Sequence, residues 1–245
     1  MSDNSAVRIF SMKAGAAPLK KAVRIFEEET GIKVAVSVCS RKCMESKAEE
    51  AHQSGGMQDF LVEISEAGIY DLAVAGAEYL LDDGEVMNIM QRGERRTIAS
   101  REAAIIVQSG NPKGIHKLED LTRPGIRIGI SVIDCLKGLW EDVCARQGLL
   151  DPIRRNITFY ACGCLAIIEA VAEGKVDAAF GWSAFKHLEP ERIEIISLPD
   201  NQSVLRGTGV GLLKLSKNVE DAKKLMNFLT TKPAQECYLE YGWVL

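Results

Sequence analysis

The sequence alternates between short apolar runs and longer segments with helical periodicity, and this alternation restricts its fold more than any other feature. Residues 7–10 predict a strand, and residues 18–30 predict a helix because apolar residues recur there at spacings of three and four. Gly31 follows as a natural helix end. The further expected strands are 33–38, 70–75, 103–107, 126–130, 157–160, 178–181 and 204–215, and the further expected helices are 44–52, 77–82, 118–121, 137–147, 165–173, 219–229 and 233–241.

A strand–helix–strand order is typical of parallel sheets with right-handed crossovers, so the fold class is α/β. The pattern restarts near residue 101 and changes again from Ile193 onward. We therefore expect two lobes, each a mainly parallel sheet flanked by helices. Residues 1–100 form the first part of lobe 1, residues 101–198 form lobe 2, and residues 199–245 return to lobe 1.

The amino-acid composition excludes several classes of protein. Of the 245 residues, 47% are apolar and 26% are charged, which excludes a disordered chain, and the net charge of −4 argues against a nucleic-acid binder. No apolar run approaches the length of a membrane span. Met1–Ser5 lacks the basic and apolar regions of a signal peptide, so we expect a cytoplasmic protein, or an extracytoplasmic one if a leader has been removed. Seven cysteines, an odd number, do not suggest a disulfide framework.

Several stretches, in this order and spacing, resemble the type II periplasmic solute-binding proteins, and most of all their molybdate and tungstate branch. Residues 19–34 (LKKAVRIFEEETGIKV) resemble the first helix and second strand of that family, and residues 70–80 (YDLAVAGAEYL) its third strand and the helix after it. Residues 110–121 (GNPKGIHKLEDL) resemble its crossover turn, and residues 174–180 (GKVDAAF) and 222–242 its late strand and tail. The resemblance covers nearly the whole chain.

The resemblance implies a ligand cleft between two lobes that close by a hinge, and delivery of the ligand to an ABC permease. Strand ends and helix N-termini that face such a cleft favour an anionic ligand. Molybdate, tungstate or a related oxyanion would then meet Ser11, Lys13, Ser40 and Arg41. The family usually carries hydroxyl and small residues in its first two cleft loops, whereas this chain has Ala16 and the run Cys39–Cys43 there.

Cysteines are concentrated in the expected cleft loops. Thiolates that converge on one cleft suit iron–sulfur clusters, zinc or copper(I). Lys13, Arg41 and Lys42 would offset the negative charge, the backbone near Gly163 would donate hydrogen bonds to sulfur, and Trp182 would form a wall or belong to the core. The candidate metal ligands are Cys39, Cys43, Cys135, Cys162 and Cys164.

Three hypotheses follow. The first is a non-enzymatic binding protein whose cleft holds a cysteine-ligated metal centre, with an iron–sulfur cluster as first choice, for storage, transfer to a receiving protein, assembly or sensing. The second is the substrate-binding component of an ABC transporter for an oxyanion. The third is a redox or thiol enzyme that uses Cys162 or Cys164. No hydrolase, metalloprotease or phosphate-loop motif is present, and no histidine falls in an expected cleft loop, so a catalytic site is not expected.

Overall fold

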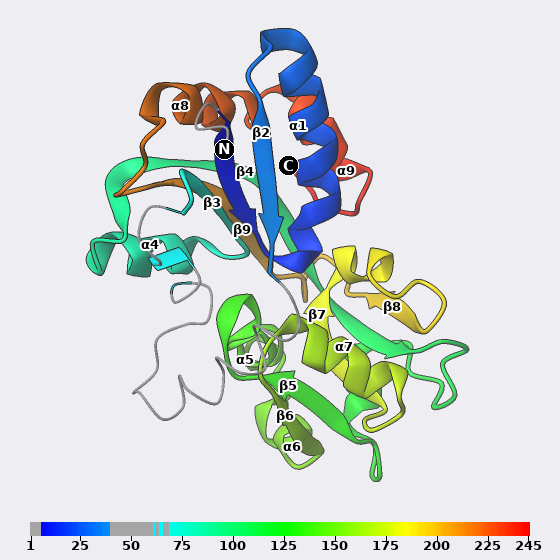
Figure 1. Ribbon diagram of the computed structural model, residues 1–245. Helices are drawn as coiled ribbons and strands as arrows, with labels where there is room; N and C mark the ends of the chain where they lie inside the picture. Colours follow the sequence, from blue (N-terminus) through cyan, green and yellow to red (C-terminus); the bar gives the residue numbers. More distant parts are fainter. Residues whose placement is uncertain (1–5, 40–60, 62–63, 66–68) are drawn as a thin grey trace. The chain divides into compact units, whose positions relative to one another are not determined.

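The computed structural model describes residues 6–39, 61, 64, 65 and 69–245, which divide between two compact units (Figure 1). Unit 1 comprises Met1–Ser100 and Arg206–Leu245, and unit 2 comprises Arg101–Leu205. The expected helix 44–52 lies outside the described residues. Within them, none of the helices has the length and apolar character of a membrane-spanning segment.

Unit 1 is built on a sheet in the order β2-β1-β3-β9-β4. Strand β1 pairs in parallel with β2 and with β3, and β3 pairs antiparallel with β9. The strands are β1 (Val7–Ser11), β2 (Val34–Val38), β3 (Leu72–Ala75), β9 (Leu205–Leu213) and the first part of β4 (Met90–Gln108). The helices are η1 (Lys13–Gly15), α1 (Ala16–Thr30), α4 (Glu78–Val86), α8 (Val219–Phe228) and α9 (Lys232–Leu239).

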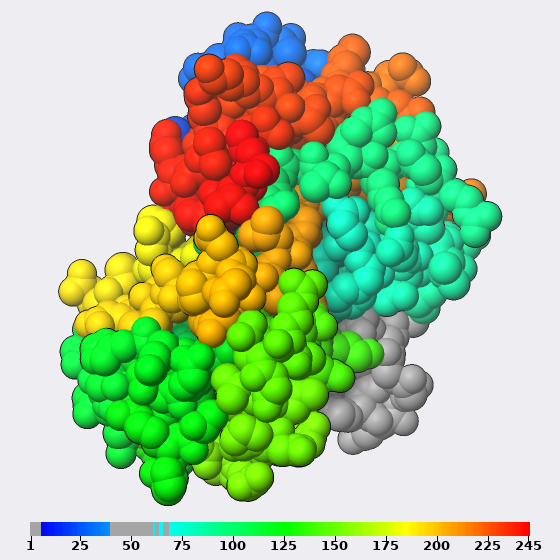
Figure 2. Space-filling view, turned by 180° about the vertical axis from the view of Figure 1, so that it is seen from behind, coloured from blue at the N-terminus to red at the C-terminus, as the bar shows by residue number. Residues whose placement is uncertain are grey.

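Helix α1 packs its apolar side against the two C-terminal helices of the same unit. It contacts α8 and α9, whose outer surfaces are orange and red in Figure 2. The rings of Phe26 and Phe228 lie 5.4 Å apart, and both Leu19 and Phe26 are buried. Gly31 ends the helix with a φ of 73°, a left-handed conformation that glycine adopts without steric cost. The apolar residues whose spacing predicted this helix therefore form the surface that packs α1 against α8 and α9.

Unit 2 has parallel pairs inside and antiparallel pairs along β4. Strand β5 pairs in parallel with β6 and β7, and β4 pairs antiparallel with β7 and β8. The strands are the second part of β4, β5 (Ile128–Ser131), β6 (Ile157–Ala161), β7 (Ala178–Trp182) and β8 (Ile193–Ser197). The helices are α5 (Leu139–Ala145), α6 (Leu150–Arg154), α7 (Cys164–Ala172), η2 (Leu118–Thr122), η3 (Asp134–Leu136) and η4 (Ser183–His187).

The α/β fold class is confirmed, but several elements differ from expectation. Strand β4 begins at Met90 rather than at residue 103, because its first half carries exposed charges instead of an apolar run. Strand β8 and the short helix α6 were not expected from the sequence. The helix expected over 137–147 is shorter, since Gly138 with a φ of 72° precedes it, and the one expected over 118–121 is a 3₁₀ helix.

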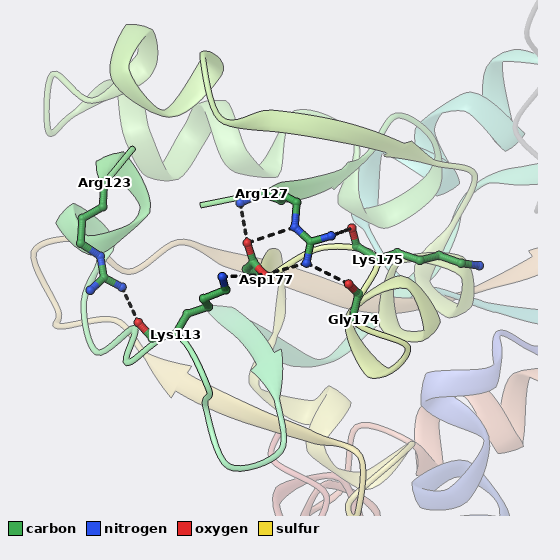
Figure 3. Close-up of polar contacts among 6 residues, drawn as sticks. All are labelled: Lys113, Arg123, Arg127, Gly174, Lys175 and Asp177. Carbon is green, nitrogen blue, oxygen red and sulfur yellow. Dashed lines mark hydrogen bonds and ion pairs between the residues drawn. The ribbon is translucent and has the colours of Figure 1, made fainter. Parts of the chain in front are cut away.

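An ion-pair cluster joins the starts of β5 and β7 (Figure 3). The Asp177 carboxylate accepts hydrogen bonds from the Arg127 backbone N–H at 2.8 Å and from Arg127 Nη2 at 2.8 Å. Lys113 Nζ lies 3.9 Å from the same carboxylate. The Arg127 guanidinium also donates to the carbonyls of Gly174 and Lys175. Burial opposes ionisation of Asp177, but these hydrogen bonds outweigh it and lower the pKa of the carboxyl group.

We expect Asp177→Asn to lower the free energy of unfolding by about 1–2 kcal/mol at pH 7, since a charged acceptor is lost. The folded-state pKa is lowered, so this contribution exists above the unfolded-state pKa of about 3.9 and disappears as the pH falls through the folded value. Urea unfolding at pH 7 and near pH 3 measures the difference, with the exposed Asp200→Asn as the matched control. An equal gap between wild type and variant at both pH values would contradict the assignment.

Candidate functional site

In unit 1, two of the predicted site residues lie at neighbouring strand ends. Ser11 is the last residue of β1 and is buried, and its Oγ donates to the Met12 carbonyl at 3.0 Å. Cys39 is also buried, and its backbone N–H donates to the Ser11 carbonyl at 3.1 Å. Lys13 is exposed. The remaining predicted residues of this region, Ser40, Arg41, Lys42 and Cys43, lie outside the described residues.

In unit 2, two of the predicted cysteines come into direct contact. Cys135 lies in η3, which follows β5, and Cys164 is the first residue of α7, which follows β6. Their Sγ atoms are 3.3 Å apart, and the two residues are only 4% and 8% exposed. The two cysteines are not joined by a disulfide bond. Because β5 and β6 are parallel neighbours, their C-terminal ends place the two loops side by side.

Backbone conformation and hydrogen bonds fix the positions of these two segments relative to each other. Gly163 has a φ of 97°, a conformation that other residues rarely adopt, and its N–H donates to Ser131 Oγ at 3.1 Å. Ser131 Oγ in turn approaches the Ile133 carbonyl at 3.3 Å. Asp134, directly before Cys135, is buried and has a φ of 50°. The N–H of Gly163 thus ties its loop to the end of β5 through this serine, and donation to a cluster sulfur by the backbone near Gly163 stays a prediction.

Two further side chains converge on Cys135 from strands β4 and β7. Arg101 Nη1 and Trp182 Nε1 each donate to Cys135 Sγ at 3.4 Å. The Arg101 guanidinium stacks over the Trp182 ring, 4.6 Å from its centroid. Strand register explains this contact: Trp182 pairs with Ala103, so Arg101 is its diagonal neighbour on the same face. Trp182 is fully buried, as a core aromatic would be, and it also touches the cysteine pair.

The protonation of the cysteine pair follows from these donors. The hydrogen bond from Cys164 and the positive charge of Arg101 outweigh burial and lower the pKa of Cys135 well below the usual range of a thiol. The same hydrogen bond, together with burial, raises the pKa of Cys164. Cys135 is therefore the thiolate of the pair and Cys164 holds the proton. Cys144, buried without such donors, has its pKa raised to about 12.

Arg101 is the residue that the sequence interpretation missed. It is only 2% exposed, and no acceptor among the described residues meets its Nε or Nη2 groups. A buried guanidinium with unused donors is costly unless an acceptor, such as a ligand, can reach it. The signal in the sequence was only weak, because Arg101 and Glu102 stand together before the apolar run 103–107 of β4.

The sequence predicted that five cysteine sulfur atoms converge, and the described part of the chain shows one such contact, between two of them. Cys135 and Cys164 meet, and the half-buried Cys162 lies two residues before Cys164. Among the described residues, no three histidine, cysteine, aspartate or glutamate side chains gather closely enough to hold a metal ion. The five-cysteine centre stays a prediction.

A model of the family described as bacterial extracellular solute-binding proteins matches residues 7–244. The chain belongs to this family. No curated protein matches the chain at the level that would mark a relative. This membership agrees with the family resemblance read from the sequence.

Solved structures of this type share the fold over almost the whole chain. Peb3 from Campylobacter jejuni is 21% identical, with a TM-score of 0.75 and coverage of 98% of this chain and 99% of that one. The periplasmic molybdate-binding protein of Azotobacter vinelandii is 18% identical, with a TM-score of 0.73 and the same coverage. The sulfate-binding protein SubI from Mycobacterium tuberculosis is 13% identical, with a TM-score of 0.76 and coverage of 98% and 86%. At these identities, the likeness concerns the fold alone.

Proposed function

We propose that this solute-binding protein takes up a small oxyanion and delivers it to an ABC permease outside the cytoplasm. Molybdate and tungstate are the first candidates. The family description supports an extracytoplasmic receptor rather than the cytoplasmic protein expected from the N-terminal residues. Structures with the same fold include proteins described as molybdate-binding and sulfate-binding, and PEB3 has been solved with L-phospholactate bound.

The observation that carries the proposal is the buried guanidinium of Arg101. Its Nη1 donates to Cys135 Sγ, while Nε and Nη2 find no acceptor among the described residues. Arginine presents its donors in a planar fork that matches two oxygens of one anion. An oxyanion that reaches Nε and Nη2 would satisfy both donors at once. The stacking on Trp182 fixes the plane of the fork before the ligand arrives.

Calorimetric titration of the reduced protein tests the proposal. We expect one of molybdate, tungstate, sulfate, phosphate and phospholactate to bind one to one with a dissociation constant of about 1 μM or lower, equivalent to roughly 8 kcal/mol. The other anions should bind more weakly or not at all, because a receptor selects by the match of its donors to one ligand. Absence of heat with every anion in this set, checked by an independent thermal-shift assay, would contradict an oxyanion receptor.

The contact between Cys135 and Cys164 favours a second candidate, a thiolate-bound metal centre such as an iron–sulfur cluster. Such a cluster takes four protein ligands, so Cys135 and Cys164 would need partners, for which Cys39, Cys43 and Cys162 are the candidates. Iron and sulfide analysis and a visible absorption spectrum of protein purified without oxygen decide this question. A colourless, metal-free protein from anaerobic cells would exclude the centre.

A further inference from the structure

The oxyanion function uses Arg101 but leaves the two cysteines beside it without a role. Three donors surround Cys135 Sγ, namely Arg101 Nη1 at 3.4 Å, Trp182 Nε1 at 3.4 Å and the Cys164 thiol at 3.3 Å. A sulfur atom that accepts three hydrogen bonds, one from a guanidinium, is held as a thiolate. A second sulfur atom in contact with that thiolate provides a partner for covalent bond formation.

We propose that Cys135 and Cys164 form a redox-active pair that closes reversibly to a disulfide, and that closure alters the charge beside Arg101. A disulfide bond is about 2.05 Å long, so the two Sγ atoms would approach by roughly 1.3 Å from their present 3.3 Å. Cys135 in η3 and Cys164 at the start of α7 follow adjacent strands whose ends are joined by the Gly163–Ser131 hydrogen bond, so the approach stays local.

The chemistry balances with hydrogen peroxide as the two-electron oxidant. The Cys135 thiolate attacks one peroxide oxygen, the O–O bond breaks, and the hydroxide that leaves takes up a proton as water. The sulfur of Cys164 then attacks the Cys135 sulfenic acid, loses its own proton and expels the second water. In sum, two thiols and one peroxide give one disulfide and two waters. A dithiol reductant reverses the step by thiol–disulfide exchange.

Closure of the pair changes the electrostatics at the proposed anion site, and this part of the inference rests on the proposed function. In the reduced state, the Cys135 thiolate accepts a hydrogen bond from Arg101 and offsets its positive charge. A disulfide is neutral, so the guanidinium would face a ligand with its full charge. Given an effective dielectric constant near 20, removal of one negative charge within about 10 Å of the ligand should tighten anion binding by at least roughly tenfold.

Peptide mapping of metal-free protein tests the pair without any ligand. The fully reduced protein is treated with hydrogen peroxide, alkylated under denaturing conditions and digested with trypsin without reductant. We expect the number of alkylated cysteines to fall from seven to five, with residues 128–137 linked to residues 156–175. Dithiothreitol should restore all seven. Fragment ions and a Cys162→Ser variant show which cysteine of the second peptide is linked.

Cys144→Ser is the matched control, because Cys144 is another buried thiol of unit 2 and lacks the donors that surround Cys135. We expect this variant to form the linkage as the wild type does, and Cys135→Ser and Cys164→Ser to lose it. Seven reduced cysteines after treatment of folded protein, or a linkage to Cys162 in place of Cys164, would overturn the pair.

Titration of the oxidised and reduced forms with the same anion then tests the charge effect. Tighter binding by the oxidised form supports it, and equal affinity refutes it while leaving the disulfide result intact. If neither form binds an anion, the oxyanion function fails, and the mapping still decides whether the pair exists.

Discussion

Arg101→Gln should weaken oxyanion binding by about 100-fold, the largest effect we expect from a single change in the proposed site. Glutamine fills part of the same volume but lacks the positive charge and the forked donors. Loss of one partner of a buried, hydrogen-bonded charge pair costs about 2–5 kcal/mol, and 100-fold corresponds to roughly 2.7 kcal/mol. Titration calorimetry with the anion that binds wild type best gives the ratio directly.

Two further variants distinguish the contribution of the planar donor geometry of Arg101 from that of its charge, and from the general effect of removing an arginine. Arg101→Lys keeps the charge but not the planar fork, so it should recover only part of the affinity. Arg127→Gln removes another arginine of unit 2, which is paired with Asp177 and 46% exposed, and should bind the anion as wild type does. Unchanged affinity in Arg101→Gln, in a protein whose unfolding remains cooperative, would exclude Arg101 as the anion ligand.

Much of the fold could be predicted from the sequence because its buried elements carry regular patterns. The strands β1, β2, β5, β6 and β7 are short apolar runs, and α1 shows its buried side at helical spacing. The first half of β4 could not be found in this way. Four of its five residues from Arg92 to Arg96 are charged, and all five are half or fully exposed. Its strand conformation depends on pairing with β9, which is distant in the sequence.

The candidate site could be predicted only in part. The missing part differs from the missing half of β4, because it depends on contacts between strands rather than on the exposure of one strand. Parallel strands bring their C-terminal ends to one edge, so the meeting of the loops that hold Cys135 and Cys164 follows from the order of elements. Arg101 reaches the same cluster across an antiparallel pairing, from a strand whose start the sequence did not reveal. Local patterns contain no record of such a diagonal contact, so the place of Arg101 beside Cys135 follows only from the strand pairing.

The second large effect concerns stability rather than binding, and it arises at Asp71 of unit 1. The Asp71 carboxylate is 1% exposed and accepts hydrogen bonds from the backbone N–H of Arg8 at 2.8 Å and from Ser216 Oγ at 2.8 Å. The N–H groups of Lys217 and Asn218 lie 3.2 and 3.3 Å away, just before α8 begins. One side chain thus joins β1, the start of β3 and the N-terminus of α8.

Asp71→Ala should lower the free energy of unfolding by about 3–5 kcal/mol, because several buried donors lose their acceptor and α8 loses a negative charge at its N-terminus. Urea unfolding followed by circular dichroism measures the loss. Hydrogen exchange should show faster opening of β1 and α8, while amides of unit 2 exchange as in wild type. Asp151→Ala, which removes an exposed carboxylate paired with Arg154, should cost less than about 1 kcal/mol. A loss at Asp71 no larger than the loss at Asp151 would mean that these hydrogen bonds do not hold unit 1 together, and that apolar packing alone fixes α8 against α1.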